Sequence, residues 1–127
     1  MDETLREWRR HPHEYGVNDC VLSAAAYFVR IGVRDAMPWF AGTYADSESA
    51  MEVLSELGGM GRAMEIVGGT SVADAPQRGD FIGLQAETDY PIPALCTGDR
   101  VAVRLERGVV EVPLKFVKWQ GVWRGVR

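Results

Sequence analysis

The sequence predicts a single α+β domain in which helices come first and an antiparallel sheet follows. Apolar residues recur at helical spacing in the first half of the chain, whereas short β-type runs separated by glycine-containing turns fill the second half. A chain of 127 residues that is 46% hydrophobic is also long enough to bury one core. We therefore expect one domain over residues 1–127, of the class in which helices and strands are segregated along the chain.

The first helix is predicted over residues 2–10. Acidic residues occupy its first turn and arginines its last turn, which suits the helix dipole. Leu5 and Trp8 lie one helical step apart and give it an apolar side. The helix is expected to end near Pro12.

A central helix is predicted from Cys20 onward. Asn18 or Asp19 is a suitable N-cap, and the preceding residues read as a loop. The run CVLSAAAYFVRI is apolar on nearly all sides, so this helix should be buried, and Gly32 is a natural end.

An outer helix and then the strands complete the expected fold. Residues 33–46 read as an ordered loop, followed by a helix that starts with a capping box from Ser49 to Glu52 and ends at the glycine pair 58–59. Residues 61–67 predict a short further helix, and residues 68–71 a turn. Five strands are then expected, within residues 79–84, 93–97, 100–106, 108–114 and 115–123.

Charge is distributed unevenly along the chain. From Arg100 onward seven basic residues face two acidic ones, whereas the first 99 residues hold seven basic and sixteen acidic residues. No dense basic run or nucleic-acid-binding motif accompanies this asymmetry, so we expect no nucleic acid partner. Arginine supplies twelve of the fourteen basic residues and is enriched at protein interfaces, which favours docking onto a protein.

Other classes of function are disfavoured by what the sequence lacks. No stretch approaches the roughly 20 apolar residues of a membrane span, and the N-terminus does not resemble a signal peptide. Cys20 and Cys96 lie far apart without CxxC spacing, so we expect no zinc site, no other metal and no cofactor. Cys96 lies in an alternating strand and is expected in the core, while Asp80 is expected to be a turn residue.

Cys20 is the candidate nucleophile. A cysteine in the first turn of a helix faces unpaired amides and the positive end of the dipole, which favours the thiolate. A thiolate nucleophile also needs a positioned histidine. The chain has only His11 and His13, both upstream of Cys20, and either one is a candidate substitute base.

Asp19 and Cys20 open an alanine-rich helix, and a Gly-Asp pair later leads into a strand. These features resemble the NlpC type of papain-like cysteine peptidase. His11, Pro12, Tyr15 and Gly16 form a loop of the pattern histidine-proline-x-x-aromatic-glycine before Asp19 and Cys20, and Trp123 lies near the C-terminus. With these residues the chain most closely resembles the small NlpC-like proteins encoded among phage tail genes.

The resemblance implies a papain-like fold, with the cysteine-bearing helix packed on a C-terminal antiparallel sheet or half-barrel. It also reveals a departure, because the strand that carries the family's histidine has Ile92 in the corresponding position. The third polar residue of the family would fall around residues 102–104, where no side chain matches its orienting group.

Two functions follow from the resemblance. The first is a structural component of a phage virion, near the tail tip or hub, which docks onto other tail proteins and has lost its peptidase activity. The second is an active peptidase or amidase that cleaves peptidoglycan peptides during DNA entry, with Cys20 as the nucleophile. The missing downstream histidine favours the first, because removal of one triad member costs orders of magnitude in rate.

The C-terminal segment supplies the interface candidates. Trp119 and Trp123, interleaved with basic residues, have the composition of an interface anchor, and Arg124 and Arg127 belong to the same group. The same tryptophans are equally suited to complete the core of the sheet. The sequence therefore allows both the core and the interface interpretation of these tryptophans.

Overall fold

A computed structural model of the whole chain describes residues 1–11, 13, 19–33, 42, 44–85, 91–105 and 108–125, with Cys20 and Ser47 described by their backbone alone. The helices are α1 (Asp2–Arg10), α2 (Cys20–Arg30), α4 (Ser47–Leu57), α5 (Met60–Ile66) and the short 3-10 helix η1 (Leu114–Phe116). The strands are β1 (Gly69–Ser71), β2 (Phe81–Leu84), β3 (Ile92–Cys96), β4 (Arg100–Leu105), β5 (Gly108–Pro113) and β6 (Trp119–Gly125). Among these residues the fold is α+β, as predicted.

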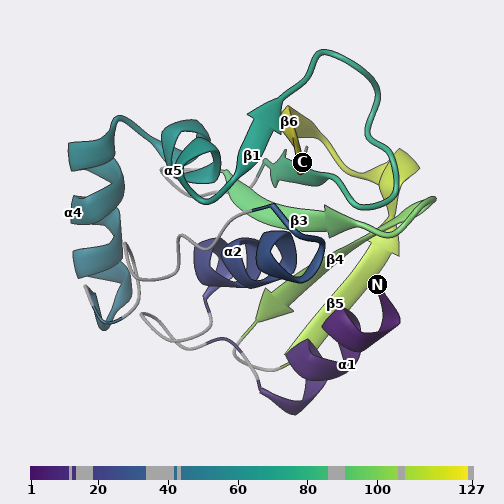
Figure 1. Cartoon of the computed structure of the whole chain (residues 1–127), viewed down its shortest axis with the longest axis horizontal. Helices are drawn as coiled ribbons and strands as arrows, with labels where there is room; N and C mark the ends of the chain where they lie inside the picture. The colour runs from purple at the N-terminus through teal and green to yellow at the C-terminus, as the bar shows by residue number, and fades with distance from the viewer. Residues whose placement is uncertain are drawn as a thin grey trace.

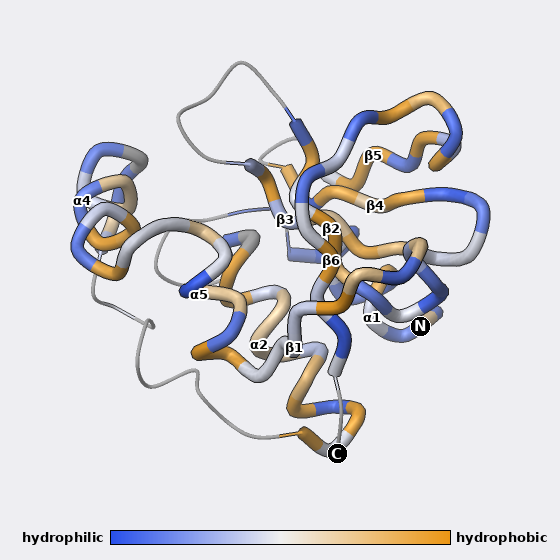
Figure 2. Tube along the Cα trace, turned by 90° about the horizontal axis from the view of Figure 1, so that it is seen from above, coloured by the Kyte–Doolittle hydropathy of each residue, from blue (hydrophilic) through white to orange (hydrophobic). Residues whose placement is uncertain are grey.

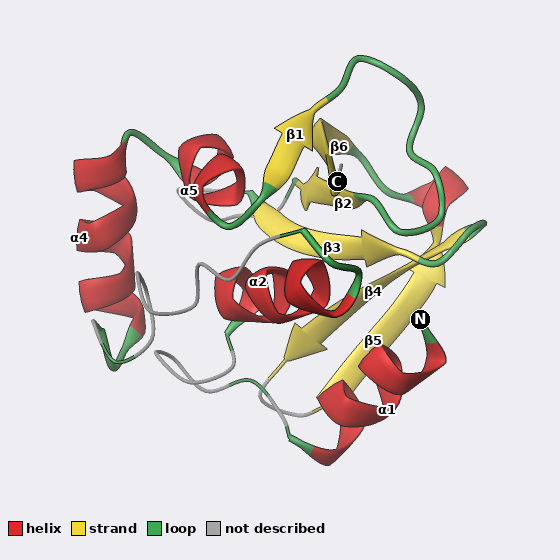
Figure 3. Ribbon diagram, in the orientation of Figure 1, coloured by secondary structure: helices red, strands yellow, loops and turns green. Residues whose placement is uncertain are grey.

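The strands form one six-stranded antiparallel sheet in the order β1-β6-β2-β3-β4-β5. The C-terminal strand β6 is inserted between β1 and β2, whereas β2 to β5 follow one another along the chain. Helix α2 packs on β3 and β4, α1 packs on β4 and β5, and α5 packs on β1 and β6 (Figure 1). Helix α4 contacts α5 and lies at one end of the molecule (Figure 3).

Both faces of the sheet bury apolar residues, because consecutive residues of a strand point to opposite faces. On the face of the helices, Phe81, Leu95, Ala102 and Trp123 join the core that α1, α2 and α5 complete. On the second face, Ile82, Ala94, Val101, Val103 and Val122 form a smaller cluster. Figure 2 shows the resulting apolar runs along the central strands.

Aromatic side chains join α1 and α2 to the sheet. The ring of Phe81 lies 6.4 Å from that of Trp8, 5.7 Å from that of Tyr27 and 5.6 Å from that of Phe28, measured between centroids. Two of these pairs are edge-on, a geometry that aromatic quadrupoles favour. Phe81 thereby fixes the position of α2, the helix that begins at Cys20.

Three local predictions are corrected. The capping box of α4 joins Asp46 to Ser49, three residues before the predicted box from Ser49 to Glu52, so the helix begins at Ser47. Residues 69–71 form the edge strand β1 where a turn was predicted, because their pairing partner β6 is distant in sequence. Residues 114–116 form η1, so the last strand begins only at Trp119.

Candidate functional site

The candidate site lies at the N-terminus of α2, which begins at Cys20 as predicted. Asp19 is the N-cap: its carboxylate accepts hydrogen bonds from the amides of Val21 at 3.0 Å and Leu22 at 3.1 Å. Asp19 is buried, and Asn18 lies outside the described residues. The Cys20 side chain is also outside what the structure describes, so its role as nucleophile stays a prediction.

Replacing Asp19 with alanine should destabilise the protein by about 1–2 kcal/mol, since it removes the acceptor of two first-turn amides. The free energy of unfolding, measured by denaturant titration, tests this. Asp19→Asn keeps an acceptor oxygen and serves as the matched control, with a smaller loss expected. An unchanged unfolding midpoint in the alanine variant would show that the cap contributes nothing.

A buried arginine from the sheet contacts α2 one turn after Cys20. The guanidinium of Arg104 donates from Nη1 to the Ser23 hydroxyl at 3.1 Å and from Nε to the His11 carbonyl at 2.6 Å. Only 5% of Arg104 is exposed. Arg104 therefore joins β4, the second turn of α2 and the segment that precedes α2.

The same segment carries both histidines. The amide of His13 donates to the carbonyl of Leu105 at 3.1 Å, so the chain at residue 13 runs beside the end of β4. The His11 imidazole lies 3.7 Å from the Glu7 carboxylate, and its side chain is 59% exposed. His13 is half-buried. The backbone thus brings the histidine-bearing segment to the end of the sheet that holds α2, while the role of either ring as a base stays a prediction.

The sheet offers no histidine to the start of α2, because both histidines of the chain precede this helix. Ile92, which the resemblance put at the family's histidine position, packs in the cluster on the second face, away from α2. Leu95 belongs to the core on the α2 face, so strand alternation places Pro93 there as well. Neither Ile92 nor Pro93 has a side chain that can accept a proton.

The sequence analysis does not identify Arg104 as a site residue, although its position in the strand pattern indicates one. In the run RVAVRL, Arg104 shares the α2 face with Ala102, which is fully buried. A charged side chain on the buried face of a strand requires dedicated partners, and here they are a hydroxyl and a carbonyl near the helix start.

A second polar cluster joins β6 to the loop before β2. The Asp80 carboxylate accepts two hydrogen bonds from Arg124, each at 2.9 Å, and one from the Gln77 amide at 2.8 Å. Arg124 also contacts Asp74 at 3.2 Å. The hydrogen bonds to Asp80 raise the pKa of Arg124 above its usual value. Arg124, predicted as an interface residue, is thus engaged within the chain, and Asp80 combines its predicted turn role with a buried ion pair.

The remaining interface candidates separate clearly. Trp123 is 6% exposed and packs in the core on the α2 face. Trp119 is 39% exposed, and its neighbour Phe116, which the sequence reading did not single out, is 75% exposed. Arg127 lies outside the described residues.

Cys96 is a buried, free thiol, as its strand position predicted. Burial raises the pKa of this thiol, and its sulfur lies 3.3 Å from the carbonyl of Gly98, to which it donates. A thiol held in its protonated form in the core is a packing residue rather than a nucleophile.

In the described part of the chain, no group of three or more histidine, cysteine, aspartate or glutamate residues is arranged to hold a metal ion. None of the helices in this part combines the length and apolar character needed to cross a membrane.

Residues 1–125 match the sequence model of a family described as a domain of unknown function, DUF6950. The chain belongs to the DUF6950 family. No curated protein and no solved structure matches it. The DUF6950 match covers the whole described fold, so the start of α2, Arg104 and the Asp80–Arg124 pair all lie inside the family domain.

Proposed function

We propose that this protein is a structural component of a phage tail, near its tip or hub, with a degenerate NlpC-type fold and no peptidase turnover. It acts by docking onto neighbouring tail proteins. The tail assignment is carried by the sequence resemblance of the loop before α2 and of the Asp19-Cys20 pair.

The observation that supports a catalytically silent site is the composition of the sheet opposite α2. Pro93 and Leu95 of β3 and the buried cation Arg104 of β4 occupy the α2 face, where an active member of the peptidase family would present its histidine and orienting group. A guanidinium is protonated at all physiological pH values and does not act as a general base.

The location is tested by mass spectrometry of purified particles of the phage whose genome encodes this chain. The chain should be present at a fixed stoichiometry to the other tail proteins. Particles that carry Cys20→Ala should plate with unchanged efficiency, since no covalent step is required. Absence of the chain from infectious particles would overturn the proposal.

The docking claim needs variants that leave the fold intact. A truncation from residue 119 would delete β6, a central strand, and would not separate docking from folding. Trp119→Ser together with Phe116→Ser changes exposed side chains only, and we expect it to lower the yield of complete tails. If this double variant assembled normal tails, Phe116 and Trp119 would not belong to the docking surface.

One observation favours the alternative, a Cys20-dependent peptidase acting on peptidoglycan. Arg104 and Leu105 hold the backbone at His11 and His13 near the end of β4. In this alternative, His13 supplies the base that β3 does not provide. This alternative predicts peptide release that is lost in Cys20→Ala and in His13→Ala.

A further inference from the structure

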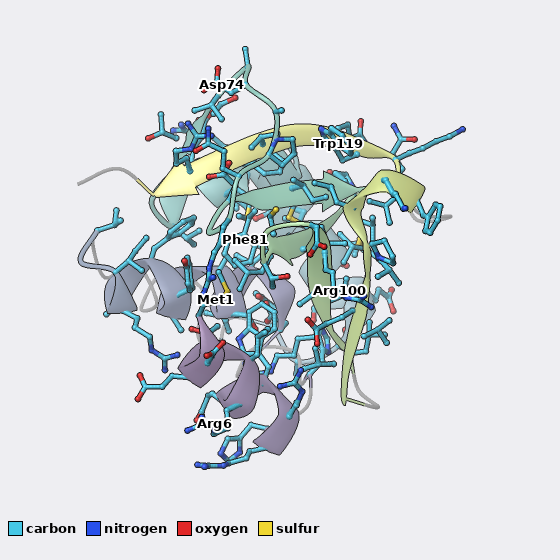
Figure 4. The ribbon with its side chains drawn as sticks, turned by 90° about the vertical axis from the view of Figure 1, so that its right-hand side faces the viewer. Met1, Arg6, Asp74, Phe81, Arg100 and Trp119 are labelled. Atoms are coloured by element: carbon cyan, nitrogen blue, oxygen red, sulfur yellow. The ribbon has the colours of Figure 1, made fainter. Side chains whose placement is uncertain are left out.

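Exposed aromatic residues gather where η1 leads into β6, and we name Lys115, Phe116, Lys118 and Trp119 the aromatic end. Phe116 and Trp119 are 75% and 39% exposed, respectively. By contrast, the aromatic residues of the core are almost completely buried. The Lys115 ammonium lies 5.1 Å from the centroid of the Phe116 ring. Figure 4 looks onto this end of the molecule and labels Trp119.

The aromatic end is positively charged. Residues 112–125 contain Lys115, Lys118 and Arg124 and no acidic residue. Among the described residues, Asp99 is an acid beside this end, since its carbonyl accepts a hydrogen bond from the Leu114 amide, and Arg100 next to it offsets that charge. Large aromatic side chains are typical of the centre of a protein-binding surface, and the rim of such a surface is polar and solvent-accessible, which suits the two lysines.

The opposite end of the molecule carries the complementary charge. Helix α4 exposes Glu48, Glu52 and Glu56, which are four residues apart and so follow one another along a single side of the helix. Residues 46–58 contain no basic residue. Hydrogen bonds from Ser49 lower the pKa of Asp46, which adds a further fixed negative charge at the helix start.

The two surfaces lie at opposite ends of the longest axis of the molecule. Helix α4 lies at the left of Figure 3, while η1 and the start of β6 lie at the right. They therefore do not contact each other within one chain, and each is available to another copy.

We infer that copies of this chain associate head to tail, with the aromatic end of one copy on the acidic side of α4 of the next. Lys115 and Lys118 then face the glutamates of α4, and the rings of Phe116 and Trp119 pack on the methylene groups of those side chains. A twofold contact that paired either surface with its own copy would place lysines against lysines or glutamates against glutamates, which like-charge repulsion disfavours. Head-to-tail contacts produce rings or open filaments, and this inference is independent of the phage assignment.

Sedimentation of the purified full chain tests the inference. The wild-type weight-average mass should increase with concentration beyond that of a dimer at about 0.05 M salt and fall at about 0.5 M salt, where surface charges are screened. A wild-type chain that stays monomeric throughout, or that stops at a dimer, would overturn it.

Two variants with one disabled surface each provide the decisive comparison. Phe116→Ser with Trp119→Ser disables the aromatic end, and Glu52→Lys with Glu56→Lys disables α4. Each variant alone should be monomeric, whereas an equimolar mixture should form a 1:1 dimer and grow no further. No dimer in the mixture, from variants with wild-type circular dichroism, would contradict the head-to-tail contact.

A charge-matched control separates this contact from a general charge effect. Asp2→Lys with Glu3→Lys makes the same change in net charge on exposed residues of α1. This variant should associate as the wild type does. If it dissociates as completely as the α4 variant, net charge and not the α4 surface controls the association, and the inference fails.

Discussion

Trp123→Ala should destabilise the protein by about 3–5 kcal/mol, a large part of the roughly 5–15 kcal/mol that holds a domain folded. The indole is 6% exposed and lies on the α2 face of the sheet among the core residues. The loss should appear as a lower denaturant midpoint with an unchanged slope.

Replacing Trp123 with alanine leaves a cavity, and neighbouring glycines explain why little can refill it. A methyl group built on Gly83 or Gly121 would meet indole atoms of Trp123 at 3.3 and 2.8 Å, so the indole fills space that these two strand positions leave open. Backbone, rather than flexible side chains, borders the indole at these positions, and backbone cannot collapse into the space.

Trp119→Ala is the matched control, four residues earlier on the same strand. Trp119 is 39% exposed, so its removal should cost less than about 1 kcal/mol. Equal losses from the two substitutions would contradict the placement of Trp123 in the core.

Asp80→Ala should cost about 3–5 kcal/mol, because it removes one partner of a buried, bidentate ion pair. The Asp80 side chain is 2% exposed, and its loss leaves the Gln77 amide without its acceptor. The loop over residues 72–80 should also become more accessible to limited proteolysis, since Arg124 joins this loop to β6 through Asp80 and Asp74. Unfolding titrations and proteolysis of the folded protein measure the two effects.

Asp74→Ala is the control for Asp80. It removes a contact of the same arginine from a side chain that is 66% exposed, and exposed ion pairs contribute at most about 1 kcal/mol. If Asp74→Ala were as destabilising as Asp80→Ala, the burial of the Asp80 pair would not be the source of its stability.

The local features of the fold were predictable from sequence, because caps and periodicity are written in neighbouring residues. The bounds of α1 and the start of α2 at Cys20 follow from dipole-compatible charges and from the Asp19 cap. Strand positions also followed, since glycine-containing turns separate β3, β4 and β5.

Features that depend on distant partners were not predictable. Strand β1 exists only because it pairs with β6, more than fifty residues later, and the same insertion of β6 buries Trp123 while leaving Trp119 at the rim. A single sequence does not specify such pairing. The face on which Ile92 lies likewise depends on the register of its strand, which the order of motifs does not give.

The candidate site likewise has features that neighbouring residues predict and features that depend on distant partners. Asp19 and Cys20 are local features, but the partners of Arg104 come from His11 and Ser23, which precede it by 93 and 81 residues. A single sequence does not reveal hydrogen bonds between residues this far apart. These bonds are what identify Arg104 as a structural cation, and a structural cation does not act as a base.

Release of peptides from purified peptidoglycan tests the central proposal, that a degenerate NlpC-type site at the start of α2 performs no turnover. The wild-type chain, Cys20→Ala and His13→Ala are incubated in parallel with a peptidoglycan peptidase as the positive control, and soluble muropeptides are quantified by liquid chromatography with mass spectrometry. We predict that wild type and both variants release no more than buffer does. Peptide release by the wild type that disappears in Cys20→Ala would contradict the account, and its loss in His13→Ala as well would identify the base.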